Sequence, residues 1–184
     1  MSELKNFSDQ AVVIKRHNFG EADRIVTLFT LKHGKLVAVA KGVRKSTSRK
    51  APHIEPFSYS NLYFATTRGM PIITQAETIN SFDHIRNNLQ TTRLAFHAIE
   101  VIDKIFVEQQ SQPEAFHQLL KLLTLLDQSN LITQTDQELA LTQFHKDLLS
   151  DLGFGMPKHQ DAKSLLDYIE HIIDRRLTAS KHLS

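Results

Sequence analysis

The sequence predicts an α+β chain of two domains: a small five-stranded β domain over residues 1–80 and an all-helical domain over residues 81–184. Three observations lead to this prediction. Near residue 80 the apolar pattern changes from short β-rich runs to helical spacing. The charge changes too, because residues 1–80 hold twelve Lys and Arg against six Asp and Glu, whereas 81–184 hold ten against fourteen. With 41% hydrophobic and 23% charged residues, the composition is that of an ordinary folded chain.

Five runs of β-branched and aromatic residues, separated by turn residues, predict the strands of the first domain. They cover Gln10 to Arg16, Arg24 to Leu31, Lys35 to Val43, Phe57 to Thr66 and Ile72 to Ile79. The break at His33-Gly34 is short enough to predict a tight hairpin. Five short strands favour a small barrel or sandwich. The OB-fold has this strand number, although strand number alone does not separate it from an SH3-like barrel.

Apolar spacing predicts about four helices in the second domain. The first carries a stripe of Leu94, Ala98, Val101 and Ile105, with Phe96, Ile99, Ile102 and Phe106 beside it. Ser111-Gln112-Pro113-Glu114 predicts a capping box, before a helix so rich in leucine that we expect it to be covered on most sides. Thr135-Asp136-Gln137-Glu138 predicts a second capping box. A last helix is expected from about Ala162 to Leu177.

The sequence lacks the residues and motifs that several kinds of catalytic and metal site require. There is no cysteine, no phosphate-binding P-loop and no G-x-S-x-G element, and no two histidines lie three to five residues apart as a helical metal site requires. We therefore expect neither an enzyme nor a cofactor or metal. The longest aliphatic run, Leu36 to Ala40, is far too short for a membrane helix, and no secretory signal is evident at the N-terminus. The expectation is a cytoplasmic protein.

The first domain carries a cluster of basic residues that favours a polyanionic partner. No acid occurs between Asp23 and Glu55. The cations of this interval are Arg24, Lys32, Lys35, Lys41, Arg44, Lys45, Arg49 and Lys50. Five of them fall within the ten residues 41–50, among hydroxyl residues that also bind phosphate oxygens. A cationic groove on a small barrel, with aromatic rings for base stacking, is how single strands are bound.

The aromatic candidates for base stacking are Phe19, Tyr59, Tyr63 and Phe64. Strand alternation puts Tyr59 and Tyr63 on one face and Phe64 on the other, so the two tyrosines are not both core residues. The aromatic residues, the basic loop and the charge difference between the domains also have explanations that involve no nucleic acid. An aromatic residue on a barrel strand is more often core, a basic loop can be a flexible linker or a nuclear-localisation signal, and charge scatters between small domains.

An ordered series of motifs resembles the RecO family of bacterial DNA recombination mediators. The series comprises Phe19-Gly20-Glu21-Ala22-Asp23-Arg24-Ile25-Val26-Thr27-Leu28-Phe29-Thr30, Gly34-Lys35, Val39-Ala40-Lys41-Gly42-Val43-Arg44-Lys45, Ser48-Arg49, Glu55-Pro56-Phe57, Ala76-Glu77, Phe82 and Ile85-Arg86-Asn87-Asn88-Leu89. Leu148 to Phe154 resembles the family's helix before its G-x-x-P turn, here Gly153 to Pro157 with one extra residue. The resemblance is densest over residues 11–90. A cysteine-bearing insertion that many members carry is missing, which argues against zinc.

The resemblance implies an OB-fold followed by a helical domain, without catalysis. It implies binding of single- and double-stranded DNA, annealing of complementary strands, and help in loading recombinase onto strands coated by single-strand-binding protein. DNA repair and homologous recombination in a bacterial cytoplasm, associated with the nucleoid, would be the setting. The DNA contacts of the family are best matched by Lys35, Lys41, Arg44, Lys45 and Arg49. Implied partners are RecR, in some lineages RecF, and the acidic, apolar tail of single-strand-binding protein.

The acidic helical domain is expected to meet protein partners. A tail that ends in a phenyl group and a carboxylate needs an apolar slot rimmed by cations. The basic residues on the relevant helices are Arg86, Arg93, Lys104 and Lys121. Two rival functions stay open at this stage: an RNA-binding OB-fold protein, and a protein-binding adaptor whose basic loop is incidental.

Overall fold

The computed structural model describes residues 6–66, 68–128 and 131–173. The chain folds into two compact units, each described by itself below. The barrel unit comprises Met1–Ser81 and Phe106–Pro113, and the helical unit comprises Phe82–Ile105 and Glu114–Ser184. The short segment 106–113 belongs with the strands, although the hydrophobic pattern of the sequence did not predict this.

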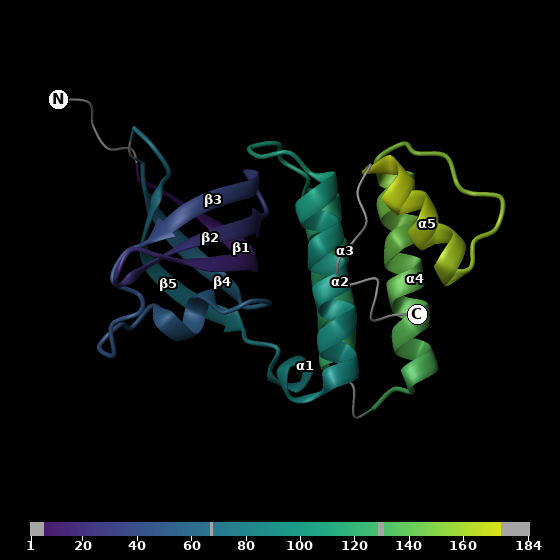
Figure 1. Ribbon diagram of the computed structural model, residues 1–184, viewed down its shortest axis with the longest axis horizontal. Helices are drawn as coiled ribbons and strands as arrows, with labels where there is room; N and C mark the ends of the chain where they lie inside the picture. Colours follow the sequence, from purple (N-terminus) through teal and green to yellow (C-terminus); the bar gives the residue numbers. More distant parts are fainter. Residues whose placement is uncertain (1–5, 67, 129–130, 174–184) are drawn as a thin grey trace. The chain divides into compact units, whose positions relative to one another are not determined.

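Five strands form the barrel unit: β1 Asn6–Phe19, β2 Asp23–Thr30, β3 Gly34–Ala40, β4 Tyr59–Ala65 and β5 Ile72–Asn80. Their order is β1-β2-β3-β5-β4, and β1 also pairs with β4, so the sheet forms a barrel (Figure 1). The predicted OB-type strands followed by helices are confirmed. β1 is longer than predicted, because its first half, Asn6–Val12, pairs with β4 and its second half, Ala11–Phe19, pairs with β2. A register shift lies between Val13 and Lys15.

The barrel core is mainly aliphatic, with side chains from every strand. Its buried members are Ala11, Val13, Val26, Leu28, Leu36, Ala38, Ala40, Val43, Ile54, Leu62, Phe64 and Ile73. Between β3 and β5 the register gives one paired position, Val39 with Ile72. The 3₁₀ helix η1, Ala51–Ile54, contacts β5 and adds Ile54 to the core.

The segment 106–113 packs on the β2–β3 hairpin. The Phe106 ring stacks on Phe29 with centroids 5.3 Å apart, and the Gln109 N–H donates to the Lys35 carbonyl at 2.8 Å. Gly34, with φ +68°, lies so close that an added Cβ would meet the Gln110 carbonyl oxygen at 1.7 Å. Glycine is therefore required at this position for space as well as for backbone conformation.

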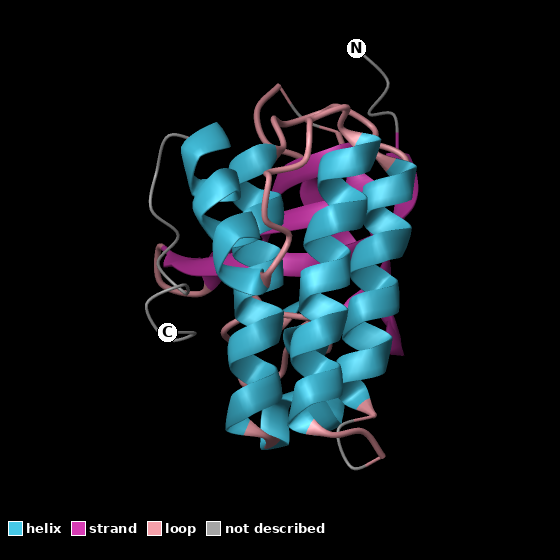
Figure 2. Cartoon of the chain, turned by 90° about the vertical axis from the view of Figure 1, so that its right-hand side faces the viewer, coloured by secondary structure: helices cyan, strands magenta, loops and turns pink. Residues whose placement is uncertain are grey.

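The helices of the helical unit are α1 Asp83–Asn87, α2 Leu89–Ile105, α3 Pro113–Asp127, α4 Gln134–Asp151 and α5 Ala162–Ile172. Only the first residue of α3, Pro113, is counted with the barrel unit. Figure 2 shows the longer helices side by side as a bundle. α3 begins at Pro113, within the motif that predicted its start. The capping box predicted at Thr135 and Glu138 is wrong. Thr133 and Asp136 form it instead, since the Thr133 hydroxyl accepts from the Asp136 N–H and the Asp136 carboxylate accepts from the Thr133 N–H.

Helix burial follows the predicted apolar spacing with two exceptions. Phe96, expected beside the buried stripe of α2, is 42% exposed, and Phe106 lies beyond the end of α2, in the barrel unit. The expected end of the last helix, near Leu177, lies outside the described residues. Among the described helices, none combines the length and apolar character that crossing a lipid bilayer requires.

Two histidines face each other inside the helical unit. The Nε2 atoms of His97 on α2 and His145 on α4 are 3.1 Å apart, and both side chains are buried. Burial lowers the pKa of His97 to about 4, opposed by the Glu100 and Glu170 carboxylates. Burial, together with the charge of His97, lowers the pKa of His145 well below its ordinary value. Both rings are thus neutral near pH 7, and one Nε2–H donates to the other ring.

Gly34→Ala should destabilise the barrel unit by more than about 2 kcal/mol, because it adds a clash with Gln110 to the cost of a positive φ. Gly20→Ala is the matched control, since Gly20 has φ +57° and no neighbour within 4 Å of an added Cβ. It should cost only about 1 kcal/mol. Urea unfolding of both variants measures the difference, and equal losses would contradict the close approach.

The free energy of unfolding should fall as the solution is acidified from about pH 6.5 to 4. In this range the two histidines bind protons in the unfolded chain but stay neutral in the folded chain. Above pH 6.5 this contribution is fully present. The shift of His97 alone corresponds to about 3 kcal/mol. Urea midpoints measured across this range should decline more steeply in the unaltered chain than in His97→Leu. The exposed control His117→Gln should follow the unaltered chain.

Candidate nucleic-acid interface

The basic loop, residues 41–50, leaves β3 and is fixed to the turn between β1 and β2. The Gly42 N–H donates to the Asp23 Oδ1 at 2.7 Å. The Arg44 N–H donates to the Ala22 carbonyl at 2.8 Å, and its guanidinium donates to the Gly20 carbonyl at 3.1 Å. Gly42 has φ +65°, which suits the sharp turn at the start of the loop. The loop is therefore an integral part of the folded barrel unit.

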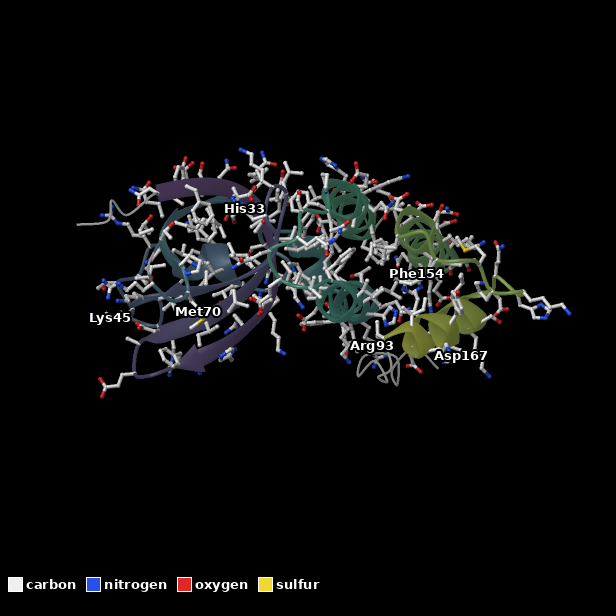
Figure 3. All side chains as sticks on the ribbon, turned by 90° about the horizontal axis from the view of Figure 1, so that it is seen from above. His33, Lys45, Met70, Arg93, Phe154 and Asp167 are labelled. Carbon is white, nitrogen blue, oxygen red and sulfur yellow. The ribbon has the colours of Figure 1, made fainter. Side chains whose placement is uncertain are left out.

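Four cations of this loop, Lys41, Arg44, Lys45 and Arg49, are exposed. Figure 3 shows Lys45 at the end of the barrel unit away from His33. Beside the loop is an open hollow of about 540 Å³. Its lining residues are Arg24, Val43, Arg44, Lys45, Ser46, Ser48, Ala51, Pro52 and Glu55. Three cations and two hydroxyls, together with the Glu55 carboxylate, thus line one open hollow.

The remaining predicted cations have other surroundings. The Arg24 guanidinium binds the Glu55 carboxylate at 2.9 Å, and its side chain is only 17% exposed. The Lys50 ammonium donates to the Ile73 carbonyl at 3.0 Å, and burial lowers its pKa despite the nearby Asp23 carboxylate. Lys35 is six residues before Lys41, which places it about 20 Å away along β3. The structure therefore does not bring Lys35 into the cluster.

Sequence reasoning missed one cation of this end of the barrel. Arg16 on β1 binds the other oxygen of Glu55 at 2.7 Å, so two guanidinium groups share one carboxylate. Arg16 lies before the acid-free interval and is therefore separate from the cluster in the sequence. Its position at the end of the first predicted strand is the signal that could have suggested it.

The predicted aromatic residues are divided between the two ends of β1. Phe19, 51% exposed, precedes the turn that binds Arg44. Tyr63, 36% exposed, pairs with Ser8 at the far end of β1. The Tyr59 hydroxyl donates to the Gln10 side chain, and burial raises its pKa. Phe64 is buried, which confirms the predicted alternation. Of these rings, Phe19 lies best to act together with the basic loop.

The four predicted cations of the helical unit do not form one cluster. Lys104 binds Glu100 at 2.8 Å and lies eleven residues after Arg93, about 16 Å along α2. Lys121 is exposed on α3, and Arg86 is half-buried on α1. Arg93 (Figure 3) has two exposed apolar neighbours on its own face of α2. They are Leu89, 69% exposed and one turn earlier, and Phe96, one turn later.

The chemistry available at these surfaces is that of binding. In the described ranges no group of three His, Cys, Asp or Glu side chains could hold a metal ion. Guanidinium, ammonium and hydroxyl groups around an open hollow supply hydrogen bonds and positive charge, which suit the oxygens of a phosphodiester chain.

Comparison with protein families gives two adjoining matches. Residues 1–82 match the family model described as "Recombination protein O N terminal", and residues 86–180 match "Recombination protein O C terminal". The boundary between the matches coincides with the change from strands to helices.

Curated relatives agree with both matches. The chain is 35% identical over 154 residues to "DNA repair protein RecO" of Dehalococcoides mccartyi (strain BAV1), covering 84% of this chain and 59% of that protein. It is 34% identical over 148 residues to the protein of the same name from Roseiflexus sp. (strain RS-1), covering 80% and 50%. The first relatives are thus matched over about three fifths of their length. With both family models matched along its length, the chain belongs to the RecO family.

Proposed function

We propose that this chain acts in DNA repair and homologous recombination as a mediator whose barrel unit binds single- and double-stranded DNA. The observation that carries the proposal is the group of exposed cations on a loop that hydrogen bonds hold in place. A fixed cationic surface attracts any polyanion, and the family name of the relatives points to DNA.

Strand annealing would follow from the same surface. Cations that contact phosphates reduce the repulsion between two strands, while the base edges stay free to pair. Phe19, exposed beside the turn that anchors Arg44, can add stacking without sequence preference. This arrangement supports binding that is independent of sequence, as a mediator of recombination requires.

The helical unit is proposed to meet protein partners during loading of recombinase: RecR, the tail of single-strand-binding protein and, in some lineages, RecF. Of the four predicted cations, Arg93 has the most suitable surroundings for an acidic, apolar tail, because Leu89 and Phe96 are exposed on its own face of α2. A cytoplasmic, nucleoid-associated location and the lack of catalysis belong to the same proposal.

Charge reversal of Lys41, Arg44 and Lys45 to Glu should weaken binding of a labelled single strand. It should also reduce the slope of log affinity against log salt by about 0.7 for each phosphate that the variant no longer neutralises. Fluorescence anisotropy at several salt concentrations measures both quantities. The matched control reverses Lys146, Lys158 and Lys163, which belong to the helical unit.

An unchanged affinity and slope in the barrel variant would contradict the assignment of this loop. Preferential binding of an RNA strand of the same sequence would favour the RNA-binding alternative. Failure of the unaltered chain to bind any strand at low salt would favour the protein adaptor.

The neighbours Arg49 and Lys50 should respond differently to replacement by Ala. Arg49 is exposed, so its removal should lower the salt slope by about 0.7 and leave stability nearly unchanged. Lys50 is bound to the Ile73 carbonyl, so its removal should cost about 1–2 kcal/mol of stability and change the slope little. Thermal unfolding and anisotropy of the two variants test this division. The reverse pattern would place Lys50, and not Arg49, on the DNA.

A further inference from the structure

Two arginines point into the end of the barrel, where a hydrophobic core would otherwise continue. Arg16 pairs with Val26 across β1 and β2, and Arg24 pairs with Ala40 across β2 and β3. Residues directly opposite each other in an antiparallel sheet point to the same face, and Val26 and Ala40 belong to the core. Both guanidinium groups therefore lie at the inner mouth of the barrel.

One carboxylate serves both guanidinium groups. Glu55 follows η1, and its two oxygens bind Arg16 at 2.7 Å and Arg24 at 2.9 Å. The three side chains together keep a net charge of +1. Within the described residues, the Nε–H groups of both arginines are buried and have no hydrogen-bond partner. A single carboxylate thus leaves part of the donor capacity of this pair unused.

A phosphodiester group can bind the same guanidinium groups as the carboxylate does. The planar guanidinium binds carboxylate and phosphate oxygens with the same two-pronged geometry. Glu55 and Arg24 both line the open hollow beside the basic loop, and the Glu55 side chain is 31% exposed. A strand that reaches Arg44 and Lys45 at the rim of this hollow would also be next to Glu55.

We propose that Glu55 occupies a phosphate site formed by Arg16 and Arg24, and that a phosphodiester of the bound single strand replaces its carboxylate. The inference rests on the proposed DNA-binding function. It adds one phosphate site, formed by Arg16 and Arg24, and one group of the protein that competes for this site, the Glu55 carboxylate. In the absence of DNA the carboxylate neutralises the inward arginines. In its presence the two guanidinium groups bind the phosphodiester.

Glu55→Gln tests the competitor directly, because the amide keeps an oxygen for the arginines and removes the charge. Affinity for a labelled oligothymidine should rise about tenfold, the value of one charge-assisted hydrogen bond. The salt slope should steepen by up to about 0.7, because no displaced carboxylate then takes up a cation when the strand binds. Glu21→Gln is the matched control. Glu21 is an exposed acid in the turn beside the same loop, and its replacement should leave the slope unchanged.

Arg16 provides a second test that does not depend on how well Glu55→Gln folds. Arg16→Gln should lower the slope by about 0.7, whereas Lys15→Gln, on the outer face of the same strand, should not. A role of Arg16 in folding alone would change only the thermal unfolding midpoint, which is measured alongside.

The outcomes separate this inference from the function on which it rests. If the unaltered chain binds the oligothymidine and Glu55→Gln has the same affinity and salt slope as Glu21→Gln, Glu55 does not compete with phosphate and the DNA-binding function stands. If Arg16→Gln leaves the slope unchanged, the phosphate site is overturned. If the unaltered chain does not bind at low salt, both proposals fail together.

Discussion

Closure of the barrel between β3 and β5 is the constraint on which this end of the molecule depends. The two strands share one paired position, Val39 with Ile72, so other groups must complete the wall. Ile54 of η1 enters the core, the Lys50 ammonium binds the Ile73 carbonyl, and a His53 ring nitrogen lies 2.6 Å from the Thr78 hydroxyl. The connection that carries the basic loop is therefore part of the barrel itself, and hydrogen bonds to β5 hold it in place.

Local patterns in the sequence were sufficient to predict the order and type of the strands and of the longer helices, but not η1 or α1. Runs of β-branched residues predicted five strands, and apolar spacing predicted the longer helices, because each pattern reflects one buried face. Precise boundaries needed more. The box at Thr133 was missed because Thr135 and Glu138 fit the same short pattern, and only the backbone conformation at Thr133 decides between them.

The cluster of cations was predictable because its members are close in sequence. Which of them are exposed and which are bound within the barrel was not predictable. Arg24 and Lys50 look like Arg44 and Arg49 in the sequence, yet strand register and barrel closure turn the first two inward. The pair of His97 and His145 lies 48 residues apart and joins two helices, so a pattern of histidines spaced along one helix could not reveal it. Such groupings depend on tertiary packing.

Residues 106–113 follow α2 in the sequence but belong to the barrel unit. The barrel unit is therefore not a continuous stretch of the chain. The chain passes from one unit to the other at 81/82, 105/106 and 113/114. A fragment cut after residue 81 would lack the ring that stacks on Phe29 and the amide that binds the Lys35 carbonyl. Gene fusion or exchange at that point would therefore not transfer an intact barrel unit, so the barrel and its helices are best inherited together.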